Sequence, residues 1–157
     1  MNLFVIHQFP ELDNFAPIIN TLSKKQDVLI LSVYPIHDFK KYKILKFLIK
    51  NKSKYKTILS LSIKLKIFNF ILKILFYLPK FFLNKINFFW RLIYHNNFFL
   101  DENLINKLKI SENLKSINID DALPKKYKQV LQDYSKKNNI PLNLYKTGVE
   151  MRREKYD

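Results

Sequence analysis

Two short, continuous apolar runs near the start of the chain constrain its fold most strongly. Residues 3–8 and 27–34 are rich in Leu, Val and Ile. Uninterrupted apolar runs of this length are typical of central strands in a parallel sheet, because such strands are buried on both faces. A helix is expected between them over residues 15–25, with Asp13 or Asn14 as its N-cap.

The same alternation of strand and helix patterns continues along the chain. Further helices are expected over residues 39–51, 100–110 and 127–138, and further strands over 56–60, 115–119 and 140–145. This order builds right-handed parallel sheets. The sequence therefore predicts one α/β domain over residues 1–157, a Rossmann-like parallel sheet flanked by helices. The strands near Leu3, Val28, Ser116 and Leu142 are expected to be parallel neighbours.

A basic, hydrophobic helical insert is expected over residues 61–97. Two predicted helices, 62–78 and 80–94, are apolar over most of their circumference and carry only a narrow polar stripe. A helix of this kind lies in the plane of lipid headgroups. The residues expected to contact the membrane are Lys66, Lys73, Lys80, Trp90 and Arg91.

The positive charge is concentrated in one part of the chain. Residues 36–94 contain fourteen Lys or Arg and one acid, whereas the rest of the chain holds fourteen basic and twelve acidic residues. Such a field attracts polyanions such as an anionic membrane surface, phosphate-bearing substrates or nucleic acid. Lipid is favoured, because upstream lysines add to the field of the insert.

Two other interpretations of this segment stay open. The insert helices could be core helices whose lysines extend to solvent. Nucleic acid ranks third, because the aromatic residues lie on the apolar side of the helices and no recognition motif appears.

Composition excludes several kinds of site. The chain has no cysteine and a single glycine, so it contains neither a thiolate site nor a Gly-rich phosphate loop. Its three histidines have no metal-ligand spacing, and we expect no metal and no cofactor. Neither a secretory signal nor an apolar run of about 20 residues is visible, which favours a cytoplasmic protein at the inner face of the cell membrane.

Candidate site residues follow the predicted strands, where parallel sheets bind their ligands. His7 ends the first predicted strand and Asp13 follows a few residues on, so His7 is the candidate catalytic base for an acceptor hydroxyl. Taken alone, His7 is more typical of a histidine at the edge of a core, hydrogen-bonded to the backbone, and Asp13 is more typical of a helix cap.

Other polar residues near strand ends have simpler explanations. His37 with Asp38 is typical of a turn, and His95 ends an apolar helix. Asp120 and Asp121 at a strand end are explained by helix capping.

Two stretches resemble the bacterial CDP-glycerol glycerophosphotransferase-like enzymes, which have the GT-B architecture. The first comprises His7-Gln8-Phe9, Phe15 to Ile19, and Val28 to Tyr34 with Pro35 and Asp38. The second comprises Leu123 to Tyr127, followed by Ser135 to Pro141. They resemble the beginning and the end of the N-terminal domain of that group, and the hydrophobic middle is similar to its membrane-facing insert.

The resemblance implies the acceptor-side domain of a cell-envelope glycosyl- or glycerophosphotransferase. The partners would be a lipid-linked acceptor and a second domain that binds the nucleotide donor, which these residues do not include. By the same resemblance, the acceptor side would be lined by His7, Gln8, Asp13 and Asn14. Gly148 and Glu150 would lie near the interdomain cleft, and Thr147 stands where relatives carry a histidine. We therefore expect a truncated chain that is inactive by itself.

Two rival functions stay open. One is half of a nucleotide-sugar epimerase, which has the same two-domain architecture but acts on soluble substrates. The other is a peripheral membrane or polyanion-binding protein without catalytic activity.

Overall fold

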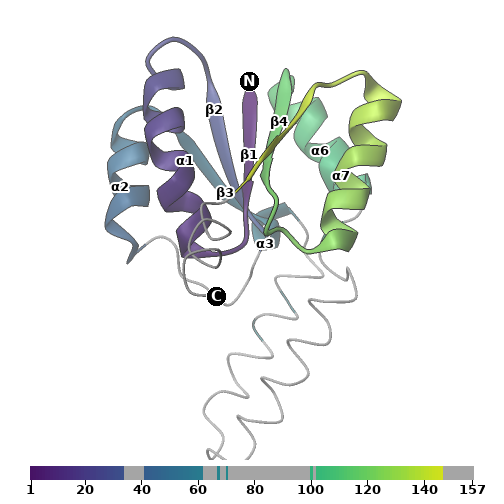
Figure 1. The fold of residues 1–157 in the computed structure, drawn as a ribbon, viewed down its shortest axis with the longest axis horizontal. Helices are drawn as coiled ribbons and strands as arrows, with labels where there is room; N and C mark the ends of the chain where they lie inside the picture. Colours follow the sequence, from purple (N-terminus) through teal and green to yellow (C-terminus); the bar gives the residue numbers. More distant parts are fainter. Residues whose placement is uncertain (34–40, 62–66, 68–69, 71–99, 101, 147–157) are drawn as a thin grey trace, which may run out of the picture.

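The fold is a layered α/β structure in which a parallel sheet lies between helices (Figure 1). The structure is a computed structural model and describes residues 1–33, 41–61, 67, 70, 100 and 102–146. Five parallel strands pair in the order β3-β2-β1-β4-β5. In chain order they are β1 (Asn2–Ile6), β2 (Val28–Ser32), β3 (Lys54–Thr57), β4 (Ser116–Asp120) and β5 (Leu142–Tyr145). The predicted Rossmann-like sheet is confirmed. The four strands predicted to be parallel neighbours are β1, β2, β4 and β5, and they are adjacent in the sheet.

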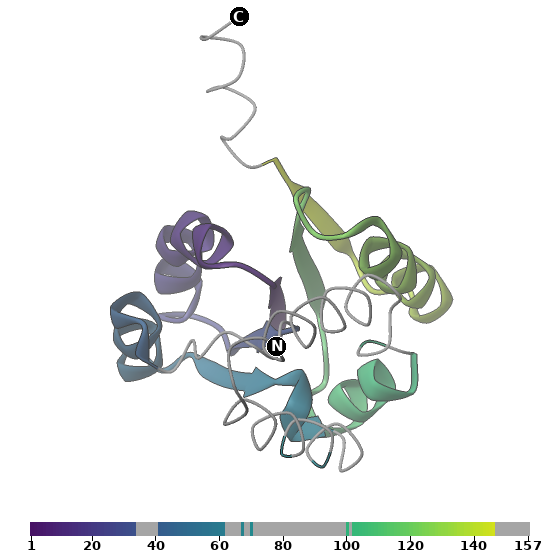
Figure 2. The ribbon, with the colours of Figure 1, turned by 90° about the horizontal axis from the view of Figure 1, so that it is seen from below.

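Helices cover both faces of the sheet (Figures 1 and 2). They are α1 (Phe9–Leu22), α2 (Lys43–Lys50), the short α3 (Ile58–Leu61), α6 (Glu102–Glu112) and α7 (Lys125–Asn138). Figure 2 shows α1 and α2 on one side of the sheet and α6 and α7 on the other. This arrangement buries the central strands on both faces, as their continuous apolar sequences require.

Alternate residues of each strand enter two separate cores. Phe4 and Ile6 pack with Leu12 and Phe15 of α1 and with Leu45 of α2. Leu3 and Val5 point the opposite way, and they join residues of α6 and α7. The period of two along a strand therefore divides β1 between the two helix layers.

Several element boundaries differ from the sequence-based prediction. The first helix begins at Phe9, so the prediction that Asp13 or Asn14 caps it is wrong. Pro10 permits this earlier start, because proline is compatible with the first turn of a helix. The third strand ends at Thr57, and α3 occupies much of the range predicted as strand. The other helices and strands begin or end within a few residues of their predicted limits.

Most of the predicted insert lies outside the described residues. Ile67 and Phe70 are described within it, and both are helical and exposed, at 56% and 64%. Within the described part of the chain, no helix has the length and apolar character needed to cross a bilayer.

Candidate functional site

At the carboxyl edge of the sheet lies the switch point between β1 and β4, where the order in which the chain adds strands changes from one side of β1 to the other. From β1 the chain proceeds to β2 and β3 on one side, and it later returns to place β4 and β5 on the other side of β1. In open parallel sheets, ligands bind outside the strand ends at such a reversal. Here this is the region beyond Ile6 of β1 and Asp120 of β4.

A buried histidine and glutamate meet at the carboxyl end of β1. Nδ1 of His7 contacts Oε1 of Glu11, four residues further along the chain. Oε2 of Glu11 accepts hydrogen bonds from the backbone N–H groups of His7 at 2.5 Å and Gln8 at 3.2 Å. The two side chains are only 5% and 2% exposed. The carboxylate thus fixes both the imidazole ring and the backbone that leads into α1.

The local sequence explains why Glu11 takes this position. Gln8 has an extended backbone and is the N-cap of α1, so Glu11 is the third residue of the helix. An acidic residue at this position reaches back to the unsatisfied N–H groups of the helix start, and it also interacts favourably with the helix dipole. The sequence-based search for site residues missed Glu11. The spacing His7-Gln8-x-x-Glu11 contains the signal, because it combines a capping pattern with a histidine one turn before the acid.

Asp120 is a second buried carboxylate at this edge. It ends β4 and is 1% exposed, and Oδ1 accepts the backbone N–H of Ala122 at 2.8 Å. The residue pair Val5 and Ile119 is in register, so the chain segments leading to His7 and Asp120 leave neighbouring strands at the same edge. Asp120 stabilises a turn and does not cap α7, whose N-cap is Pro124. The prediction of helix capping by these aspartates is therefore wrong.

Asp121 has a different environment from Asp120. Its carboxylate accepts a hydrogen bond from Nζ of Lys128 at 2.8 Å, and the same ammonium group donates to the Asp121 carbonyl. This hydrogen bond, together with the positive charge of Lys128, lowers the pKa of Asp121. The ion pair ties the turn after β4 to the first turns of α7.

The predicted acceptor-side residues are only partly brought together. Gln8 is exposed next to His7, whereas Asp13 and Asn14 are exposed within the body of α1. Both carboxylate oxygens of Asp13 accept from the Tyr42 hydroxyl, at 2.7 and 2.9 Å. This hydrogen bond to a carboxylate raises the pKa of Tyr42. Asp13 thus joins α1 to the start of α2, and a role in acceptor binding stays a prediction.

A polar network centred on the buried Asn118 lies on the face of the sheet that carries α1. Asn118 is 2% exposed and donates to the carbonyl of Leu3 at 3.1 Å. Its Oδ1 accepts from Asn143 at 2.9 Å and from the Tyr145 hydroxyl at 3.4 Å. The Tyr145 ring packs edge-on against Phe15 of α1, with 5.3 Å between ring centroids. The alternation Ser-Ile-Asn-Ile-Asp in β4 could have predicted this polar face.

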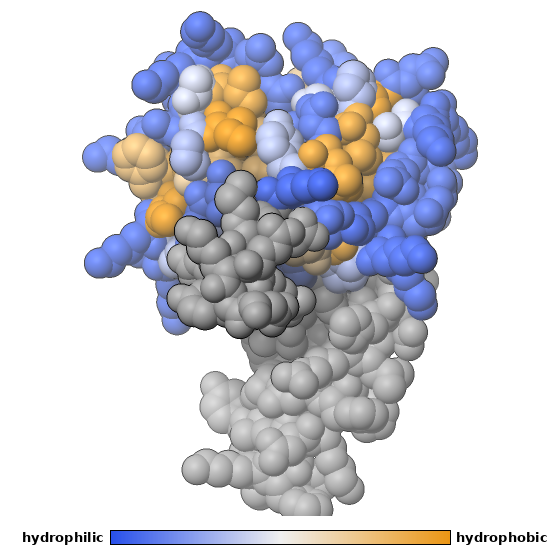
Figure 3. All heavy atoms as spheres, viewed as in Figure 1, coloured by the Kyte–Doolittle hydropathy of each residue, from blue (hydrophilic) through white to orange (hydrophobic). Residues whose placement is uncertain are grey.

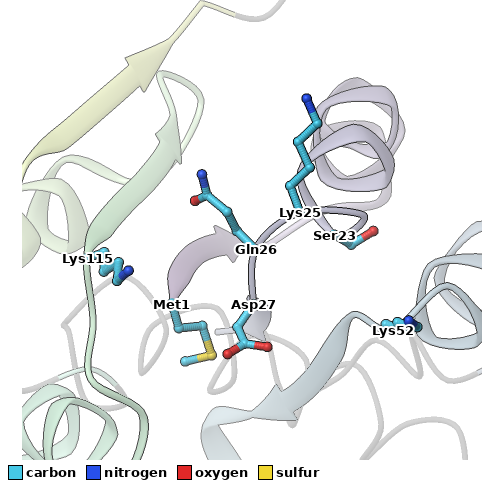
Figure 4. Close-up of a pocket in the computed structure, with 7 residues that line it drawn as sticks. All are labelled: Met1, Ser23, Lys25, Gln26, Asp27, Lys52 and Lys115. Atoms are coloured by element: carbon cyan, nitrogen blue, oxygen red, sulfur yellow. The ribbon is translucent and has the colours of Figure 1, made fainter.

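A pocket of about 360 Å³ lies at the opposite, amino edge of the sheet (Figure 4). Its lining residues are Met1, Ser23, Lys25, Gln26, Asp27, Lys52 and Lys115. Lys25, Lys52 and Lys115 each lie within three residues of the C-terminal end of a helix. Helix C-termini carry partial negative charge, which lysines neutralise. These cations are therefore explained by the helix ends, and the pocket lies away from the edge at which ligands of parallel sheets bind.

The other predicted site residues lie outside the described part of the chain. They are Gly148 and Glu150 of the expected cleft and Lys66, Lys73, Lys80, Trp90 and Arg91 of the expected membrane surface. Among the described residues, no group of three or more His, Cys, Asp or Glu side chains could hold a metal ion. Comparison of the chain with protein-family models, with curated proteins and with solved structures found no match.

Proposed function

We propose that this chain is the acceptor-side domain of a cell-envelope glycosyl- or glycerophosphotransferase that associates peripherally with membrane. The observation that carries the proposal is the contact between His7 and Glu11 at the carboxyl end of β1. This contact places an oriented imidazole where parallel α/β sheets bind ligands. The resemblance of the two end segments to CDP-glycerol glycerophosphotransferase-like enzymes supplies the reaction class.

His7 would act as the general base on an acceptor hydroxyl. Nδ1 faces the Glu11 carboxylate, so a neutral ring that keeps its proton on Nδ1 would present the lone pair of Nε2 to the acceptor. As the acceptor oxygen bonds to the carbon or phosphorus of the donated group, the bond to the leaving nucleotide breaks and the hydroxyl proton passes to Nε2. The 5% exposure of the His7 side chain would keep bulk water away from this transfer.

Membrane association is supported by the distribution of charge and of exposed apolar side chains. The segment from residue 36 to 94 holds almost all of the net positive charge. Ile67 and Phe70 are both exposed and are three residues apart, so they share one helix face. A basic helix that exposes apolar side chains fits the interface of an anionic bilayer.

The acceptor site can be tested directly by NMR. The chain contains three histidines, so single substitutions at His7, His37 and His95 assign the three ring signals. sn-Glycerol 3-phosphate is the probe, because it carries the hydroxyl and phosphate groups of a polyol-phosphate acceptor. We expect it to shift the ring signals of His7 and to leave those of His95 unchanged.

Glu11→Gln provides the matched variant for this titration. It keeps the size of the side chain and one acceptor oxygen but removes the charge that orients the ring, so the response of His7 should weaken while the circular dichroism spectrum is retained. A His7 signal that ignores the probe at every concentration would contradict the acceptor role. A response to UDP-sugars without any response to glycerol phosphate would favour the epimerase-like function instead.

A further inference from the structure

The outward face of α2 combines three lysines with one phenylalanine. Leu45 and Leu48 are fully buried against α1 and the sheet. Lys43, Lys46, Phe47 and Lys50 follow the spacing i, i+3, i+4 and i+7, so they form one stripe on the opposite side of the helix. All four are exposed, and Phe47 is 52% exposed.

Helix stability accounts for only one member of this stripe, because Lys50 lies in the last turn of α2, where the helix dipole favours a cation. Lys43 lies in the first turn of α2, which has no acidic residue and where the helix dipole disfavours a cation. Lys46 and Lys50 are one turn apart, a spacing at which like charges repel. Within the described residues, none of the three lysines pairs with a carboxylate. The sequence has no acid from residue 39 to 100, so no nearby acid along the chain offsets them.

Exposed apolar side chains accompany these charges. Ile49, on the flank of the stripe, is 42% exposed. Figure 3 shows hydrophobic side chains over α2 at the left edge of the molecule, among hydrophilic ones. A Phe and an Ile exposed beside lysines can enter the boundary between headgroups and acyl chains while the ammonium groups bind lipid phosphates.

The packing of α2 holds this face in place before anything binds. The Tyr42 hydroxyl bonds to Asp13, and its ring packs against Phe9 at 4.8 Å between centroids. Near the other end, Asn51 donates to the side chain of Asn20 at 3.0 Å. Both ends of α2 are therefore attached to α1, so docking would require little further ordering.

We propose that the face formed by Lys43, Lys46, Phe47 and Lys50 is a docking surface for an anionic lipid bilayer. The proposal rests on the proposed membrane association, and it assigns that association to a helix of the sheet domain in addition to the insert. Phe47 alone could stack on a base. Lipid nevertheless fits the face better than nucleic acid, because the face has no Arg, Asn or Gln to read base edges and the exposed Ile49 beside it adds aliphatic surface that suits the acyl boundary.

The test is co-sedimentation with vesicles made of equal parts phosphatidylcholine and phosphatidylglycerol. Replacing Lys43, Lys46 and Lys50 together by Gln should lower the partition coefficient by about fivefold for each lysine removed. The matched control replaces the exposed Lys125, Lys126 and Lys136 of α7, on the other side of the sheet, and should change binding much less. Phe47→Ser should weaken binding more than Leu144→Ser, which changes an exposed apolar residue of β5.

The outcomes distinguish membrane association itself from its assignment to α2. If the unmodified protein ignores anionic vesicles, the membrane association itself is wrong. If it binds and the two lysine triples lose binding equally, the assignment to α2 is overturned. Tighter binding to a short duplex RNA than to vesicles, with no effect of Phe47→Ser, would identify the face as a nucleic-acid surface. Vesicle binding that persists without any His7 response to glycerol phosphate would contradict the transferase function alone.

Discussion

Glu11 holds His7 through two atoms at once: it accepts the His7 backbone N–H at 2.5 Å and contacts Nδ1 of the same residue. The two residues are four positions apart at the junction of β1 and α1, with His7 just before the N-cap Gln8 and Glu11 in the first turn of the helix. A single carboxylate therefore serves the start of the helix and the orientation of the candidate base. These two roles can be separated by experiment.

Replacing Glu11 by Ala should destabilise the domain. The change leaves the N–H groups of His7 and Gln8 without their acceptor and removes the carboxylate from the first turn of α1. We expect the free energy of unfolding to fall by about 1–3 kcal/mol, measured by urea denaturation. Asp133→Ala is the control, because this exposed carboxylate on α7 bonds only to Gln129 among the contacts of the described residues and should cost less than about 0.5 kcal/mol. Equal decreases in the free energy of unfolding of the two variants would contradict the capping role of Glu11.

The polar network around the buried Asn118 should behave as a unit. Asn118→Ala removes the acceptor for Asn143 and the donor to the Leu3 carbonyl, so it should lower the free energy of unfolding by about 1–3 kcal/mol. A double-mutant cycle with Asn143→Ala should give a coupling energy of at least about 0.5 kcal/mol. Strict additivity of the two substitutions would mean that the hydrogen bond between them contributes nothing to stability.

Burial of Tyr127 should make the domain sensitive to alkali. Its side chain is fully buried, and desolvation raises the pKa of the phenol above its ordinary value. Because the folded pKa is raised, the contribution to stability is complete below the unfolded pKa, about 10, and is lost as the pH rises above it. Near pH 11 the loss is about 1 kcal/mol.

Tyr127→Phe tests this pH dependence. The variant should lose less stability than the unmodified protein between pH 10 and pH 11, as followed by urea denaturation at each pH. Tyr42 and Tyr134 also have a raised pKa and are present in both proteins, so they cancel in the comparison. Parallel stability curves for the two proteins would show that Tyr127 does not titrate on unfolding.

The lysines of the insert should contribute to vesicle binding independently of α2. Changing Lys66, Lys73 and Lys80 to Glu should weaken co-sedimentation with anionic vesicles without unfolding the sheet. Binding of the unmodified protein should fall as salt increases, because the screening length shortens to about 3 Å at 1 M. Co-sedimentation that depends neither on lipid charge nor on salt would exclude an electrostatic mechanism of binding.

The sequence by itself determined the layered α/β fold and the order of most of its elements. The runs at Leu3–Ile6 and Val28–Leu31 are apolar without interruption, and a strand buried on both faces is the structure that satisfies such runs. The helix patterns between strands then required parallel crossovers. These are local periodicities, so they can be read from neighbouring residues.

Only the tertiary structure decided which polar side chains meet. The sequence predicted Asp13 as a helix cap, but its carboxylate accepts a hydrogen bond from the hydroxyl of Tyr42, 29 residues further along the chain. Glu11 instead accepts the N–H of the N-cap residue Gln8. Asn118 contacts Asn143 because β4 and β5 pair in one register, with Asn118 opposite Asn143. Such contacts depend on how strands and helices pack across the sheet, and the spacing of residues along the chain does not contain that information.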